Sequence, residues 1–205
     1  MIMPITEITN KEYLDVVRRF AALAQFRDRN IRNHLERIRG YSLVISKGYG
    51  LSLQEANTIC YASQLHDIGE IGIPDSILSK SGELTTYEWE ILKRHTVIGA
   101  DILKGSLSVI LQAGEIIALT HHERWNGSGY PQGLKGEDIP LSGRVCAIAD
   151  VFDALTTKRS YKDIISVEEA VNLLQETRGE LLDPELVDVF VENLDEIRKI
   201  RIQYS

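Results

Sequence analysis

Apolar residues recur at spacings of three and four positions along most of this chain, which places them on one face of an α-helix. One such set is Leu51, Ala56, Ile59 and Ala62, and another is Val167, Ala170, Val171 and Leu174. No segment shows the strict alternation of a half-buried strand. The pattern therefore predicts an all-α fold, a compact bundle of about seven to nine helices.

Helix starts are marked by residues that cap free backbone amides. Three segments have the form Ser/Thr-x-x-Glu, at residues 52–55, 85–88 and 166–169, and "DPELV" at 183–187 puts an Asp cap before a Pro at the first helical position. The expected helices are residues 10–25, 30–47, 53–65, 74–79, 86–104, 107–121, 141–156, 166–177 and 184–197, each within a few residues.

Two connections differ from the short loops between these helices. The first is "DIGEIGIPDSIL" at residues 67–78, and the second is the Gly- and Pro-rich stretch "LTHHERWNGSGYPQGLKGEDIP" at 119–140. A long structured loop in a compact domain is more often functional than merely connecting. Both stretches are therefore candidates for the functional site.

Length and composition restrict the class of protein. With 205 residues the chain fits one domain, which we place at residues 29–205, with residues 1–28 as an N-terminal helical extension. No apolar run approaches a membrane span, and no secretory signal opens the chain, so a cytoplasmic location is expected. Cys60 and Cys146 are interpreted as small buried residues. A net charge of −7 argues against nucleic-acid or anionic-membrane binding.

The chain has five histidines, and each of them falls in or next to a predicted helix. They are His34, His66, His95, His121 and His122; Asp67 follows one of them directly, and Asp150 lies in a strongly apolar helix. A buried carboxylate is costly unless it is paired or bound to a metal. Imidazoles and carboxylates without thiolates suit iron, manganese, nickel or zinc. Seven ligands exceed the needs of one ion, so two ions that share a bridging carboxylate and a bridging water are expected.

These residues stand in an ordered series of motifs: "HD" at 66–67, "HH" at 121–122, "GYP" at 129–131 and "DVFDAL" at 150–155. The series resembles the HD-GYP domain, over roughly residues 28 to 191. The resemblance implies a helical fold of the HD phosphohydrolase type. It also implies a bacterial phosphodiesterase that linearises cyclic di-GMP to pGpG, and onward to GMP, by attack of a bridging hydroxide.

The resemblance also assigns roles to residues. His34, His66, Asp67 and Asp150 would surround one ion, and Asp67 would bridge to a second ion held by His95, His121 and His122. Iron or manganese is expected, with nickel or zinc as alternatives. Tyr130 of "GYP" would contact the nucleotide, as would Arg159 and Lys162. Asp153, one turn after Asp150, is expected to orient a metal-bound histidine. Regulatory receiver, sensory or GGDEF-type domains or proteins are the expected partners.

Two positions depart from the family pattern. Glu70 stands where "HDIGK" has a lysine that assists substrate binding or leaving-group protonation, and Asn30 replaces a glutamate of members that bind a third ion. We therefore expect two ions, and we expect Glu70 to act at the catalytic site by weakening turnover. Two alternatives stay open: a degenerate domain that binds metal and nucleotide as a signalling module, and a hydrolase of another phosphate ester.

Overall fold

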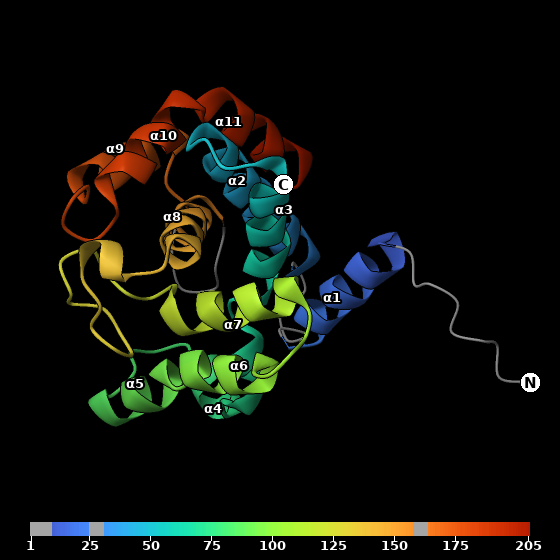
Figure 1. Ribbon diagram of the computed structural model, residues 1–205. Helices are drawn as coiled ribbons and strands as arrows, with labels where there is room; N and C mark the ends of the chain where they lie inside the picture. The colour runs from blue at the N-terminus through green and yellow to red at the C-terminus, as the bar shows by residue number, and fades with distance from the viewer. Residues whose placement is uncertain (1–9, 25–30, 158–163) are drawn as a thin grey trace, which may run out of the picture.

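A computed structural model describes residues 10–24, 31–157 and 164–205, and every regular element in these ranges is helical (Figure 1). The α-helices are α1 (Asn10–Ala24), α2 (Ile31–Gly48), α3 (Leu53–Ala62), α4 (Asp75–Leu78), α5 (Thr86–Lys93), α6 (His95–Leu103), α7 (Val109–Thr120), α8 (Leu141–Thr156), α9 (Val167–Glu176), α10 (Pro184–Glu192) and α11 (Leu194–Gln203). Three short 3-10 helices are η1 (Ser63–Leu65), η2 (Ile68–Gly72) and η3 (Gly136–Asp138). The predicted all-α class is confirmed.

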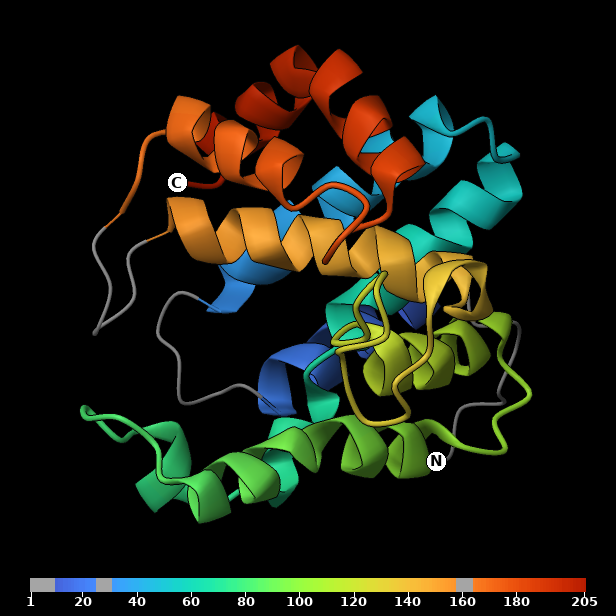
Figure 2. The ribbon, with the colours of Figure 1, turned by 90° about the vertical axis from the view of Figure 1, so that its left-hand side faces the viewer.

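Helices α2 and α8 form the centre of the molecule. Figure 2 shows α8 lying between the layer of α9, α10 and α11 on one side and helices α6 and α7 on the other. Tyr41 of α2, Phe152 of α8 and Phe190 of α10 are fully buried and pack edge to face, with ring centroids 5.3 and 4.9 Å apart. Such aromatic contacts add to the hydrophobic contribution of burial. This core fixes the two helices that carry His34 and Asp150.

The predicted capping boxes are present at α3, α5 and α9. In each, the hydroxyl of Ser52, Thr85 or Ser166 accepts from the amide three residues on, and the glutamate there accepts from the cap amide. Asp183 likewise accepts from the amides at the start of α10. Each cap satisfies amides that have no partner within the helix, so the sequence marked these starts correctly.

The single helix predicted over residues 86–104 is instead two helices that meet at Arg94. His95, expected deep within a helix, is the first residue of α6. At this break the His95 ring donates from Nδ1 to the Leu92 carbonyl at 2.7 Å, and Thr96 Oγ1 donates to the Lys93 carbonyl at 2.9 Å. These side chains bond carbonyls at the end of α5, which lets the chain turn and directs His95 inward.

The helix predicted over 184–197 is also divided, at Asn193, and the second part, α11, runs further than expected, to Gln203. The Asn193 side chain donates to the Val189 carbonyl at 2.8 Å, which ends α10 as a cap. The remaining predicted helices agree with the structure within a few residues. The 3-10 helix η2 lies within residues 67–78, which were expected to be an unusual connection.

Helix α1 packs against α2, η1 and η2, and it buries Val17 and Ala21 in the main core. The predicted boundary between residues 28 and 29 lies outside the described residues, so this domain division stays a prediction. Both cysteines are buried and unpaired, as expected. Among the described helices, none combines the length and the apolar character that a membrane crossing requires.

Candidate metal centre

The seven predicted ligands come from elements spread along most of the chain. His34 lies within α2 and Asp150 within α8, whereas His66 and Asp67 stand between η1 and η2. His95 begins α6, and His121 and His122 directly follow α7. The fold brings all seven together into two neighbouring clusters.

The first cluster, cluster A, contains Asp67, His95, His121 and His122, whose ligand atoms lie within 4.8 Å of one another. His95 Nε2, His121 Nε2 and Asp67 Oδ1 are mutually separated by 3.4 Å. The centre of such a triangle lies about 2.0 Å from each corner, which matches the usual metal–nitrogen and metal–oxygen distances. Cluster A therefore has the spacing of a metal site.

The second cluster, cluster B, contains His34, His66 and Asp150, again with ligand atoms within 4.8 Å. His66 Nε2 lies 3.9 Å from Asp150 Oδ1 and 3.2 Å from Asp67 Oδ2. Asp67 thus turns Oδ1 toward cluster A and Oδ2 toward cluster B. A carboxylate in this position has the geometry required to join two ions.

Each of four imidazoles is held through its Nδ1 atom. His66, His95 and His121 donate to the backbone carbonyls of Ser63 at 2.9 Å, Leu92 at 2.7 Å and Ile117 at 3.0 Å, respectively, and His34 donates to the Asp153 carboxylate at 2.8 Å. A carbonyl can only accept, so Nδ1 carries a proton, and in the neutral imidazole Nε2 keeps its lone pair. Metal-binding histidines are commonly oriented in this way.

Asp153 is itself held by Arg37, a buried residue that the sequence analysis did not single out. Arg37 Nε donates to Asp153 Oδ1 at 2.5 Å, and Nη2 donates to Oδ2 at 2.9 Å. Against the raising effect of burial, the hydrogen bonds from Arg37 and His34 lower the pKa of Asp153 to about 2. The position of Arg37, three residues after His34 on the same helix, was the only signal for this role.

The electrostatics of the two clusters fit metal ions. His66 Nε2 is buried without a hydrogen-bond partner among the described residues. Burial opposes the charged form of His66, but with no ion bound the charges of Asp67 and Asp150 raise its pKa to about 10. Burial lowers the pKa of His95, and it holds that of His122 well below its usual range. His95 and His122 thus favour the neutral form that binds first-row ions, and a cation bound at His66 would have to displace its second imidazole proton.

Tyr130 lies against cluster A. Its ring centroid is 4.8 Å from that of His122, and its amide donates to the His122 carbonyl at 3.2 Å. Gly129 makes this approach possible, because a Cβ there would lie 2.3 Å from the Arg124 amide nitrogen. The sequence-predicted nucleotide contact therefore borders the candidate metal centre.

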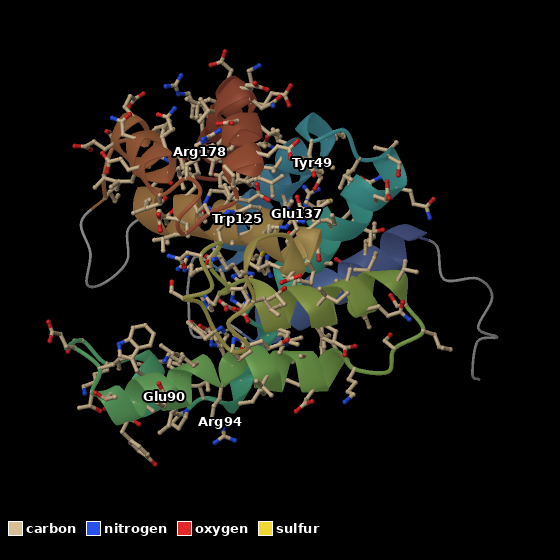
Figure 3. All side chains as sticks on the ribbon, turned by 60° about the vertical axis from the view of Figure 1, so that its left-hand side comes forward. Tyr49, Glu90, Arg94, Trp125, Glu137 and Arg178 are labelled. Atoms are coloured by element: carbon tan, nitrogen blue, oxygen red, sulfur yellow. The ribbon has the colours of Figure 1, made fainter. Side chains whose placement is uncertain are left out.

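The loop around Tyr130 is fixed by Glu123, a buried residue that the sequence analysis missed. Glu123 is 2% exposed, and its two oxygens accept from the amides of Gln132 at 2.7 Å and Leu134 at 3.0 Å. Trp125, labelled in Figure 3, donates its amide to the Leu181 carbonyl at 3.1 Å and so joins the loop to the connection between α9 and α10. A charged residue directly after two histidines was the available signal.

The other predicted site residues belong to neither cluster or fall outside the described residues. Glu70 belongs to neither cluster; it is half-buried in η2, and its amide donates to the Asp67 carbonyl at 3.0 Å. Glu70 thus shares one turn with the residue between the clusters. Arg159, Lys162 and Asn30 lie outside the described residues.

Comparisons with known sequences agree on one family. The sequence profile described as "HD domain" matches residues 17–186. A cyclic di-GMP phosphodiesterase of Thermotoga maritima is 48% identical over 178 residues, covering 87% of this chain and 48% of that protein. The 3′3′-cGAMP-specific phosphodiesterase 2 of Vibrio cholerae is 45% identical over 193 residues, covering 94% and 36%.

A third relative is the cyclic di-GMP phosphodiesterase response regulator RpfG of Xanthomonas campestris pv. campestris, 40% identical over 205 residues, covering 100% of this chain and 54% of that protein. The chain thus spans about half or less of the length of these relatives. A solved cyclic GMP-AMP-specific phosphodiesterase from V. cholerae superposes with a TM-score of 0.64 at 23% identity, covering 92% of this chain and 50% of that one. This likeness supports the fold.

Proposed function

Because the chain belongs to the HD domain family, as its resemblance to HD-GYP domains predicted, we propose that it is a metal-dependent phosphodiesterase. Its proposed substrate is cyclic di-GMP, which it would linearise to pGpG and carry onward to GMP. The relatives named above act on cyclic dinucleotides by their names, and the site of this chain has the donors that such a reaction requires.

The observation that carries the proposal is the pair of clusters with Asp67 between them. We propose that cluster A would hold one ion and cluster B the other, and that Asp67 would be a ligand of both. The proposed metal is iron or manganese at each position. Two such ions supply activation of the attacking water and neutralisation of charge that develops on the phosphate. The donor count in the described residues suits two ions, and Asn30 offers no carboxylate for a third.

The chain's own residues would orient these ligands and bind the substrate. Asp153 and Arg37 fix the His34 ring through the Nδ1 hydrogen bond, which keeps Nε2 directed into the site. Tyr130, held by the Glu123 anchor, would stack on or bond to the nucleotide beside cluster A. Arg159 and Lys162 are proposed to bind the guanine base and a phosphate, roles that an arginine fork suits well.

A second substrate, 3′3′-cGAMP, has a specific observation in its favour. The V. cholerae enzyme named for that nucleotide is 45% identical to this chain, close to the 48% of the cyclic di-GMP enzyme from T. maritima. The two nucleotides differ in one base and share both phosphodiesters. Identity alone therefore does not choose between them.

The direct test is turnover of both nucleotides by protein loaded with Mn²⁺ or Fe²⁺, with bound metal measured by elemental analysis. We expect two metal equivalents and faster hydrolysis of cyclic di-GMP. Faster hydrolysis of 3′3′-cGAMP would make that nucleotide the substrate and would leave the proposed phosphodiesterase reaction unchanged. Two bound equivalents without hydrolysis of either nucleotide would favour the degenerate signalling domain instead.

Partners are proposed on the same basis. One relative carries the name of a response regulator, and the match covers 54% of its length. We propose that receiver, sensory or GGDEF-type domains or proteins regulate the phosphodiesterase. Co-purification of such a protein from the source cell with the tagged chain would test this.

A further inference from the structure

A lysine lies at the rim of the site next to the proposed nucleotide contact. Lys93 ends α5, two residues before the cluster A ligand His95, and its ammonium is 5.6 Å from the ring centroid of Tyr130. Tyr130 in turn packs on His122 of cluster A at 4.8 Å. The helix break at Arg94 therefore places this cation beside the metal ligands and the loop.

The partner of Lys93 is weakly held. Lys93 Nζ lies 2.7 Å from Glu90 Oε1, but the Glu90 side chain is 63% exposed and that of Lys93 is 36% exposed. Exposed ion pairs contribute little to stability, so an entering anion can replace the Glu90 carboxylate at small cost. Lysine is also a compact point charge on a flexible stem, which suits contact with a phosphate that arrives from solvent.

The need for such a cation follows from Glu70. The family pattern has a lysine at that position, and here a carboxylate takes its place. A substrate with two phosphodiester charges then lacks one cation near Asp67, while the whole chain carries a net charge of −7. Arg124, next to the anchor Glu123, adds a second cation on the same side, because its backbone amide faces Gly129, the residue before Tyr130.

We infer that Lys93 binds a phosphate group of the substrate at the Tyr130 side of cluster A. The inference rests on the proposed function and names a further binding residue for it. Glu90 acts as the resident counter-ion that the phosphate displaces.

The test compares four single substitutions at residues 90, 93 and 94, at the end of α5 and the break that follows it, at equal metal content. Lys93→Gln removes the cation, and we expect KM for cyclic di-GMP to rise roughly ten- to hundredfold, the effect of one charge-assisted contact, with a smaller change in kcat. Glu90→Gln removes the competitor and should lower KM. Arg94→Gln is the matched control, because Arg94 is exposed and points away from the loop in Figure 3. Lys93→Arg should restore most of the affinity.

A second readout separates this inference from the proposed function. The affinity of the metal-loaded protein for inorganic phosphate, measured by calorimetry, should fall for Lys93→Gln and stay constant for Arg94→Gln. This measurement is meaningful even if the wild type hydrolyses no cyclic dinucleotide, in which case the proposed function fails alone. Equal phosphate affinity in wild type and Lys93→Gln, or an equal loss in both variants, would overturn the role of Lys93.

Discussion

Asp67 differs from every other ligand of the site because its two carboxylate oxygens face different clusters. Burial opposes its charge, yet His66 and the hydrogen bond from His121 hold the pKa of Asp67 well below its ordinary range. It is therefore a carboxylate at neutral pH, as a bridging ligand must be. No second residue among the seven is placed to serve both clusters.

We predict that Asp67→Ala lowers bound metal from two equivalents toward none, because each cluster loses a ligand and the two ions lose the charge between them. Elemental analysis after desalting measures this. Tyr130→Phe is the control and should retain both equivalents, since the phenol lies outside both clusters. Two tightly bound equivalents in Asp67→Ala would show that Asp67 is not the bridge.

We predict that Glu70→Lys raises phosphodiesterase activity. Two unit charges about 4 Å apart interact by about 4 kcal/mol at an effective dielectric of 20, so even a strongly screened reversal should change the rate or KM more than roughly tenfold. The comparison is with Glu83→Lys, the same charge change at an exposed position of the loop before α5. Equal or lower activity of Glu70→Lys at matched metal content would contradict the prediction.

At the scale of single residues, the seven histidines and aspartates named from the sequence do lie together, but the residues that support them were not identified. The seven could be named because they stand in an ordered series of motifs that resembles the HD-GYP domain. Arg37 and Glu123 are charged residues in amphipathic segments, where solvent exposure is the usual outcome. The burial of Arg37 depends on Asp153, 116 positions away, whereas that of Glu123 depends on a loop that bends back to bring amides 9 and 11 positions on against its carboxylate.

At the scale of elements, the starts of helices could be predicted and two of their interruptions could not. A capping box is local, so two residues within a stretch of four are enough to identify it. The breaks at Arg94 and Asn193 interrupt no apolar period, and they depend on side chains that bond helix carbonyls only in the folded backbone. The first break bears on the proposed function, because it directs His95 into cluster A and puts Lys93 beside Tyr130.

The cap of α5 provides a prediction about pH. Hydrogen bonds from Lys80, then from the Thr85 amide and hydroxyl, lower the pKa of Glu88 from 4.5 to about 2. Because the folded pKa is the lower one, the stability from Glu88 is complete above about pH 5 and is lost as pH falls toward 2. In urea unfolding, the difference in the free energy of unfolding between wild type and Glu88→Gln should be constant from pH 7 to 5 and become smaller below pH 5. For Glu83→Gln, which lies outside the cap, the difference in the free energy of unfolding from wild type should not change with pH in this way.

Close contact between elements also limits substitution. Gly69 of η2 lies so near the start of α6 that a Cβ would come 1.9 Å from the His95 carbonyl oxygen. We predict that Gly69→Ala separates Asp67 from His95 and destabilises the fold by about 1–3 kcal/mol, the usual cost of overpacking. Denaturant midpoints and metal content measure the two effects. Gly82→Ala is the control, since nothing lies within 4 Å of the added Cβ.

At the scale of the whole molecule, the candidate ligands come from both the α2 and α8 core and the α6 and α7 side, two parts that Figure 2 shows next to each other. We predict that removal of the ions with a chelator lowers Tm by roughly 5–10 °C. An ion present at a hundredfold its Kd adds about 2.7 kcal/mol to the folded state, and about 2–4 °C follow from each kcal/mol in a chain of this size. Calorimetry with and without EDTA measures the shift. Asp67→Ala should show none.

The pairing of Arg37 with Asp153 also closes a long loop, because the two residues lie 116 positions apart in the chain. The entropy lost in closing a loop grows with its length, so contacts between α2 and α8 form only when most of the chain has already been ordered. Cluster B, which joins α2 to α8, cannot then exist in a half-folded chain. Uptake of Mn²⁺ at cluster B by refolding protein should consequently proceed at the rate of the final recovery of tryptophan fluorescence, so that metal uptake reports the completion of folding.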